Sequence, residues 1–235
     1  MESKLWLTSF YTPAYKWSAE LLRHTALACG GVTNVKLWTP EDVRYVQDNP
    51  DIFKQGSKGF GSYAWKSHVI RMTPDLMAPG EWMVYCDSTM LVESDIKQYL
   101  QQPQLRGSNA IVFRLGEAEA KGYTNGAWSK PGMFDAMGMT HDKYKTCWQL
   151  NAGMIMLKKT DPTITLVDEW VGWCSNPSVI SDDGPPAPKE HRHDQSILTA
   201  LCQHHKDQEG CGYSSGPLVE QPLSFRSCGG RQGLF

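Results

Sequence analysis

The 235-residue sequence lacks long apolar runs, CxxC pairs and any marked excess of one charge. No window approaches the 18 apolar residues of a transmembrane helix, and the N-terminal apolar stretch is too short for a signal peptide, so we expect no membrane span and a cytoplasmic location. With 23 Lys and Arg against 25 Asp and Glu, the net charge of −2 provides no general field for nucleic acid, and we expect no such partner. Seven cysteines without CxxC spacing favour free thiols, with Cys211 and Cys228 the one pair that could form a bridge.

The order of apolar and amphipathic segments predicts a single α/β domain. A strand at 4–10, a helix at 17–29 and a strand at 34–38 form the β-α-β opening that is typical of a parallel sheet covered by helices. Apolar runs predict three further strands, at 83–86, 110–115 and 153–159. The remaining helices are expected at 39–53, 66–77, 93–102, 161–176 and 193–205. The proline-rich stretch 181–190 is expected to be a loop, and 211–235 a flexible tail or flap.

The segment MVYCDSTMLV, residues 83–92, is unusual because a buried strand runs directly into an acid and two hydroxyls. A buried, unpaired carboxylate costs several kcal/mol, so Asp87 should face a cleft, a cation or a hydrogen-bond donor. Ligands of α/β sheets lie beyond the carboxyl ends of strands, where an Asp can hold Mg²⁺ or Mn²⁺ while water and substrate phosphates complete the coordination shell. The alternative is that Asp87 or Ser88 caps the helix that follows.

Two other polar segments could contribute to a site. NAGMIM, residues 151–156, places an amide and a glycine just before a strand, as recognition of a polyol requires, although an ordinary turn would have the same residues. EHRHDQSIL, residues 190–198, places Asp194 and Gln195 at a helix entrance, where Asp194 could be a helix cap or a general base. The nearby His191, His193, Cys202, His205 and Cys211 raise a zinc alternative, but their spacing fits no established ligand pattern.

Basic residues lie close to glycine-rich turns at Lys58, Lys66, Arg71 and Lys130, where ammonium groups and free backbone amides could bind phosphate. Solvated surface lysines are the alternative for each of them. The stretch GSKGFGS, residues 56–62, matches neither the P-loop nor the dinucleotide-binding fingerprint. Any phosphate site must therefore be built in another way.

Several of these segments occur in one order that resembles a known family. GFGSYAWKSHVI, EWMVYCDSTMLV, WSKPGMFDAMG, QLNAGMIMLKK and EHRHDQSILTALC are similar to motifs of nucleotide-sugar glycosyltransferases of the glycosyltransferase-A fold, including bacterial capsule and lipopolysaccharide enzymes and viral ones. The similarity covers residues ~55–203 and depends on several moderately specific motifs in sequence. It implies one Rossmann-like domain with a mainly nucleotide-binding half at 1–100 and a mainly acceptor-binding half at 101–210.

The resemblance also implies roles for individual residues. Asp87 would be the first acid of a DxD-like motif and the ligand of a divalent cation, Mn²⁺ or Mg²⁺, and Asp194 and Gln195 would lie at the reaction centre. The donor would be a nucleoside-diphosphate sugar and the acceptor a glycan or another hydroxyl compound. The residues expected to bind the donor are Thr8, Phe10, Tyr11, Lys58, Trp65, Lys66, Asp87, Ser88, Thr89, Lys130, Asn151, Ala152, Gly153 and His193.

The sequence departs from the family pattern at three places, two of which bear on the cation and one, Ser67, on the local turn. Thr89 replaces the second acid, Ser67 replaces a proline, and a late His-x-x-Gly-x-x-Lys-Pro element is missing. Lysines could then neutralise the leaving diphosphate in place of a metal. The sequence therefore predicts a hexosyl- or related sugar transferase; a catalytically inactive sugar-nucleotide or glycan-binding module is the alternative.

Overall fold

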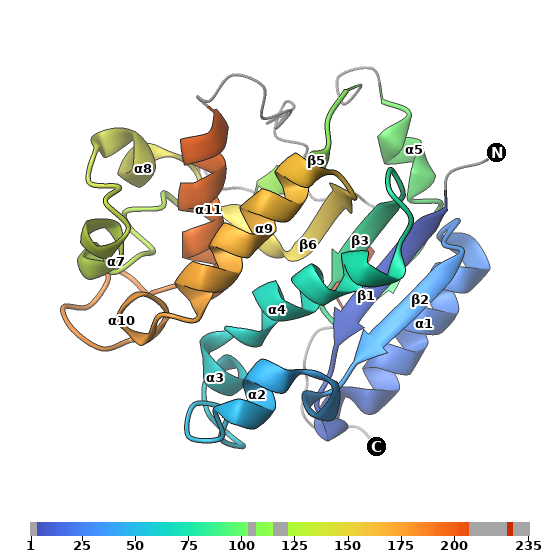
Figure 1. Cartoon of the computed structure of the whole chain (residues 1–235), viewed down its shortest axis with the longest axis horizontal. Helices are drawn as coiled ribbons and strands as arrows, with labels where there is room; N and C mark the ends of the chain where they lie inside the picture. The colour runs from blue at the N-terminus through green and yellow to red at the C-terminus, as the bar shows by residue number, and fades with distance from the viewer. Residues whose placement is uncertain (1–3, 103–106, 115–121, 207–224, 228–235) are drawn as a thin grey trace.

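The computed structural model describes residues 4–102, 107–114, 122–206 and 225–227. Its centre is a five-stranded sheet in the order β2-β1-β3-β6-β5, and a two-stranded sheet pairs β4 with β7 (Figure 1). The strands are β1 Leu5–Phe10, β2 Asn34–Trp38, β3 Trp82–Cys86, β4 Met90–Val92, β5 Ala110–Arg114, β6 Leu150–Lys158 and β7 Phe225–Ser227.

Four strands of the central sheet point the same way. β1 is parallel to β2 and β3, while β6 runs antiparallel to both of its neighbours, β3 and β5. The beginning of β6 therefore lies beside the carboxyl end of β3, with Met154 paired to Cys86. The predicted α/β domain with a central, mainly parallel sheet is confirmed.

Helices cover both faces of this sheet (Figure 1). The α-helices are α1 Lys16–Cys29, α2 Arg44–Asp48, α3 Gly59–Ser62, α4 Trp65–Met72, α5 Lys97–Leu100, α7 Pro131–Ala136, α8 Asp142–Thr146, α9 Asp161–Cys174, α10 Pro177–Ile180 and α11 His193–Lys206. Short 3-10 turns occur at Pro13–Tyr15, Pro40–Asp42 and Thr73–Leu76. No helix in these described ranges is long and apolar enough to span a membrane.

Side chains of β3 alternate between two hydrophobic cores, as the period of a strand requires. Val84 and Cys86 join the core under α1, whereas Met83 and Tyr85 join the core under α4, α9 and α11. Asp87 follows Tyr85 by two residues and hydrogen-bonds to it, so it faces the side of the sheet that α4 and α11 cover. The strand period thus directs this acid toward two helices that carry other polar residues.

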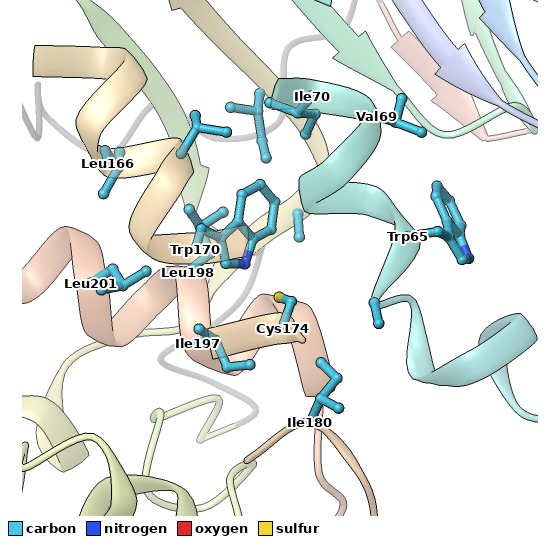
Figure 2. Close-up of a cluster of buried hydrophobic side chains, with 14 of the residues drawn as sticks. Trp65, Val69, Ile70, Leu166, Trp170, Cys174, Ile180, Ile197, Leu198 and Leu201 are labelled. Atoms are coloured by element: carbon cyan, nitrogen blue, oxygen red, sulfur yellow. The ribbon is translucent and has the colours of Figure 1, made fainter. Parts of the chain in front are cut away.

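The core on that side joins three helices that are distant in sequence. Figure 2 shows Trp65 and Ile70 of α4 with Trp170 of α9 and Leu198 of α11 among the buried side chains. Trp170 is 1% exposed, and its indole N–H donates to the backbone carbonyl of Asp194 at 3.0 Å. The packing of these helices therefore also fixes the first turn of α11.

The structure corrects several predicted boundaries. The helix expected at 39–53 divides into the 3-10 turn and α2, because the Thr39–Asp42 capping box closes the turn and Val43 is extended and buried. The helix expected at 93–102 shortens to α5, and Asp95, whose carboxylate accepts the N–H of Lys97 at 2.8 Å, lies just before its first turn. Asn151 lies within β6 and not in a turn before it. The loop at 181–190 is as predicted, while Cys211, Cys228 and nearly all of the tail lie outside the described residues.

Candidate functional site

Three charged side chains meet at the carboxyl end of β3. The Nζ atom of Lys66 lies 3.2 Å from Oδ1 of Asp87 and 3.3 Å from Oδ2 of Asp194. Lys66 and Asp194 are buried, with 4% of each side chain exposed, whereas 40% of the Asp87 side chain is exposed. We call these three residues the Lys66 cluster. It opens to solvent on the Asp87 side.

Each member of the Lys66 cluster comes from a different element. Asp87 follows β3, where its N–H donates to the carbonyl of Gly153 at 2.9 Å, so the sheet pairing fixes its backbone. Lys66 lies in the first turn of α4, and Asp194 is the second residue of α11. These residues, predicted separately from three motifs, are brought together by the fold.

Tyr85 binds the Asp87 carboxylate on one side, and Gly153 leaves room for it on the other. The hydroxyl of Tyr85 donates to Oδ1 of Asp87 at 2.7 Å. Gly153 offers space on the other side, because a Cβ at this position would come within 2.8 Å of Oδ2 of Asp87 and 3.0 Å of Oδ1 of Asn151. The amide oxygen of Asn151 in turn accepts the N–H of Gly153 at 2.8 Å. Gly153 thus has a reason to be a glycine, namely the close approach of a carboxylate.

Burial and the neighbouring charges shift the pKa values of the two buried groups, Asp194 and Lys66. Burial raises the pKa of Asp194 to about 6; Lys66 opposes this shift and the negative charge of Asp87 adds to it. Burial alone would lower the pKa of Lys66, but the two carboxylates raise it overall. Lys66 is therefore charged at neutral pH, and Asp194 titrates in the range that suits a general base. Oδ2 of Asp194 makes no hydrogen bond among the described residues, and the 3.3 Å ion-pair contact is its partner.

Three aromatic rings surround the ammonium group of Lys66. Its Nζ lies 5.3 Å from the ring centre of Tyr63, 5.4 Å from Tyr85 and 5.8 Å from Trp65. Ring faces attract cations, and more strongly where water is excluded. Sequence reasoning identified Trp65 but missed both tyrosines. Tyr85 could have been found from the strand period, since it lies two residues before Asp87 on the same face.

The short segment α3, together with Tyr63, forms a strained left-handed turn before α4. Residues 59–63 all have positive φ angles, from 47° at Phe60 to 79° at Gly61, and the N–H groups of Ser62 and Tyr63 donate to the carbonyls four residues earlier. This is one turn of left-handed helix, which costs roughly 1–2 kcal/mol for each non-glycine residue in it. The Tyr63 ring covers Gly59 so closely that a Cβ there would overlap it. Such strain is typical of functional sites, and here it places Tyr63 at the edge of the cluster.

A buried amide network supports the other side of the site. Gln195 donates from Nε2 to Oε1 of Gln149 at 2.6 Å, and its Oε1 accepts the N–H of Ala152 at 3.4 Å. Gln149 is fully buried and donates to Asn125 at 2.9 Å. The network ties the start of α11 to the start of β6. Sequence reasoning missed Gln149 and Asn125, although a polar residue beside the apolar run of β6 was an available signal.

Lys58 and Lys130 do not join the Lys66 cluster; both contact the loop at 181–190. The Nζ of Lys130 donates to the carbonyls of Ser181 at 2.6 Å and Asp183 at 3.1 Å. Lys58 forms ion pairs with Glu190 at 3.0 Å and Asp182 at 3.6 Å. In this structure the two predicted phosphate-binding lysines tether that loop.

His191 and His193, around the start of α11, bond to backbone carbonyls at the end of α10, directly before that loop. His193, with a strained φ of 48°, pairs its Nδ1 with the carbonyl of Ile180 at 2.8 Å, and His191 pairs its Nε2 with Val179 at 3.0 Å. His205 instead pairs with Glu169 at 2.9 Å. Burial lowers the pKa of both His191 and His193, to about 4 for His191. These contacts give the zinc alternative no support among the described residues.

Three of the residues expected to bind the donor, Thr8, Phe10 and Tyr11, lie in the second half of β1 or directly after it. Thr8 is fully buried and its hydroxyl accepts the indole N–H of Trp38 at 3.0 Å, while Phe10 stacks on Trp65 with ring centres 4.1 Å apart. Tyr11 is half-buried beyond them. Ser88 and Thr89 follow Asp87, Ser88 buried and Thr89 half-buried. Thr8 and Phe10 thus pack in the interior, and Tyr11 is the most solvent-accessible of the three.

The described residues do not fit a divalent metal site. Within 4–102, 107–114, 122–206 and 225–227, no three His, Cys, Asp or Glu side chains come together as metal ligands. Oδ1 of Asp87 already contacts Lys66 and Tyr85, and the nearest second acid, Asp194, is paired with the same ammonium. A divalent ion bound to Asp87 would have to share its carboxylate with the Lys66 ammonium, which repels a second cation.

Comparisons with known proteins found neither a matching family model nor a matching curated protein. Among solved structures, the chain is similar to the bifunctional glycosyltransferase WbbM with 11% identity and a TM-score of 0.48, covering 86% of this chain and 38% of that one. It is similar to a glycosyltransferase involved in glycosylation of the PBCV-1 major capsid with 12% identity and a TM-score of 0.41, covering 73% and 67%. For mouse xyloside xylosyltransferase 1 the values are 12%, 0.45, 87% and 83%.

Each of these three proteins is a glycosyltransferase by its description, and none shares more than 12% sequence identity with this chain. The chain spans little more than a third of WbbM. A function for this chain must be argued from its own site.

Proposed function

We propose that this protein is a glycosyltransferase that moves a sugar from a nucleoside-diphosphate sugar to a hydroxyl group of a glycan or other acceptor. The observation that carries the proposal is the Lys66 cluster, in which one buried ammonium joins the acid at the end of β3 to the acid at the start of α11. The position beyond the carboxyl end of a strand is where α/β sheets bind ligands. The ordered sequence motifs that contain these residues support the same chemistry.

The exposed acid would bind the donor. Asp87 is held by Tyr85 and Lys66 and exposes 40% of its side chain, so a donor can reach it. Its negative charge is balanced by Lys66, which lowers the repulsion that a diphosphate would otherwise meet. Thr89, Asn151 and Tyr63 offer hydroxyl and amide groups for ribose or sugar hydroxyls at the same edge.

The buried acid would act on the acceptor. If the anomeric configuration inverts, Asp194 takes the proton of the acceptor hydroxyl while the acceptor oxygen bonds to the anomeric carbon. The bond from that carbon to the phosphate oxygen breaks, and its electron pair leaves with the nucleoside diphosphate. If the configuration is retained, the carboxylate would instead orient the donor sugar or stabilise positive charge on it. The burial of Asp194 and its pKa of about 6 suit either role.

A thermal-shift panel would test the donor class first. The ligands are UDP, GDP, dTDP, CMP and their common sugar conjugates, and a ligand at 100 times its Kd adds about 2.7 kcal/mol to stability. The bound donor is then incubated with a panel of sugar acceptors, and release of the nucleotide is followed. Transfer that is lost in Asp194→Asn supports the proposal. A nucleotide that binds without any transfer would favour the inactive binding module. That alternative is suggested by Thr89, which replaces the second acid.

A further inference from the structure

We infer that Lys66 is the resident cation of this site, so that its ammonium group, in place of a divalent metal ion, joins the donor acid Asp87 to the transfer acid Asp194. The inference deepens the proposed function and rests on it. Its immediate consequence is that donor binding and transfer need no added metal.

Charge balance is the first argument. The cluster contains two carboxylates, and one ammonium lies within 3.3 Å of both. The position two residues after Asp87, where a DxD motif would have its second acid, is Thr89. A site with one fewer acid needs one fewer positive charge, and a monovalent ammonium supplies what remains. A divalent ion added beside that ammonium would change the net charge of the donor-free cluster from −1 to +1.

The surroundings are built for an ammonium. The side chain of Lys66 is 4% exposed, and the ring centres of Tyr63, Trp65 and Tyr85 lie 5.3 to 5.8 Å from its Nζ. Ring faces attract ammonium groups, whereas Mg²⁺ and Mn²⁺ prefer oxygen ligands and bound water. The turn that carries Tyr63 holds five successive positive φ angles, so a strained backbone maintains this wall. The ammonium thus lies between two acids and three aromatic rings.

The bridge also couples the two halves of the reaction. With both acids ionised, the cluster carries one net negative charge. When the acceptor proton moves to Asp194, the cluster becomes neutral, and the ammonium is balanced by Asp87 alone. The proton taken from the acceptor thus removes negative charge near the leaving diphosphate at the moment when that group gains it.

A first experiment needs no variant. The Kd of the nucleotide-sugar found in the panel is measured by calorimetry in EDTA and again with Mn²⁺, and transfer is followed under both conditions. We expect Kd and rate to agree within about threefold. Tightening by Mn²⁺ beyond that, or transfer only with Mn²⁺, would overturn the inference while leaving glycosyl transfer intact. Absence of binding in both conditions would instead contradict the proposed function.

A second experiment removes the ammonium. Lys66→Met should weaken donor binding by at least about tenfold, and Mn²⁺ should not restore it, whereas Lys66→Arg should retain part of it. Lys54→Met is the matched control, because Lys54 exposes 67% of its side chain and pairs only weakly with Asp51 at 3.8 Å. Circular dichroism confirms that each variant is folded. Recovery of Lys66→Met binding by Mn²⁺ would show that a metal can occupy the site and would refute the inference.

Discussion

Replacing Gly153 by Ala should damage both stability and donor binding. The added Cβ would lie 2.8 Å from Oδ2 of Asp87, 3.0 Å from Oδ1 of Asn151 and 3.3 Å from Cε of Met90. Asp87 cannot move aside freely, since Tyr85 and Lys66 hold its other oxygen. Overpacking in such a site costs about 1–3 kcal/mol, and contact with two polar oxygens places our expectation at about 2–3 kcal/mol.

Urea unfolding would measure the stability change, and calorimetry the affinity for the nucleotide-sugar. Gly172→Ala is the matched control, since Gly172 lies in α9 with ordinary φ and no atom within 4 Å of the new methyl group. Alanine is the better helix former, so this control should gain about 0.5–1 kcal/mol. A Gly153→Ala protein with unchanged stability and unchanged affinity would refute the close approach of Asp87 to β6.

Four further predictions concern Asp194 and Ser62. Asp194→Asn should lower transfer at least about a hundredfold, measured as nucleotide release; activity that survives would show that Asp194 has another role. Because burial raises the pKa of Asp194 to about 6, a base at this position predicts a rate that falls about tenfold per pH unit below pH 6. Because the folded state binds this proton more tightly than the unfolded state, protonation of Asp194 adds to the free energy of unfolding fully below pH ~4, and the gain is lost as pH rises through about 6. Urea unfolding of the wild type and of Asp194→Asn across this range would test the trend. Ser62→Gly should relieve a left-handed residue and stabilise the fold by about 1 kcal/mol in urea unfolding, whereas Ser57→Gly should destabilise it, because the Ser57 hydroxyl accepts the N–H of Gly61 in that turn.

The fold was largely predictable because local sequence patterns determine most of its strands. β1, β2 and β3 begin and end within one residue of the predicted segments, since apolar runs flanked by turn residues determine them. β4 was missed because its three residues gain their structure by pairing with β7, which is distant in sequence. The short helices α7, α8 and α10 were missed for a related reason: four to six residues carry too little periodicity to predict.

The site was predictable in its members but not in its contacts. Asp87, Lys66 and Asp194 were each selected from a motif, yet no local pattern shows that one ammonium lies between two acids that are 107 residues apart, at positions 87 and 194. Lys58 and Lys130 resembled Lys66 in sequence, being basic residues near glycines. Tertiary packing distinguished them by directing Lys58 and Lys130 to the loop at 181–190.

The buried charges of the site are better explained by function than by stability. Removing Lys66 alone, as in Lys66→Met, should cost about 3–5 kcal/mol in urea unfolding because it leaves Asp194 buried without its partner. The double variant Lys66→Met/Asp194→Leu replaces both buried ions with apolar side chains, and such exchanges are neutral or stabilising by about 1–4 kcal/mol. We therefore expect it to be at least as stable as the wild type and inactive in transfer. A double variant as unstable as Lys66→Met would mean that the charges are needed for folding itself.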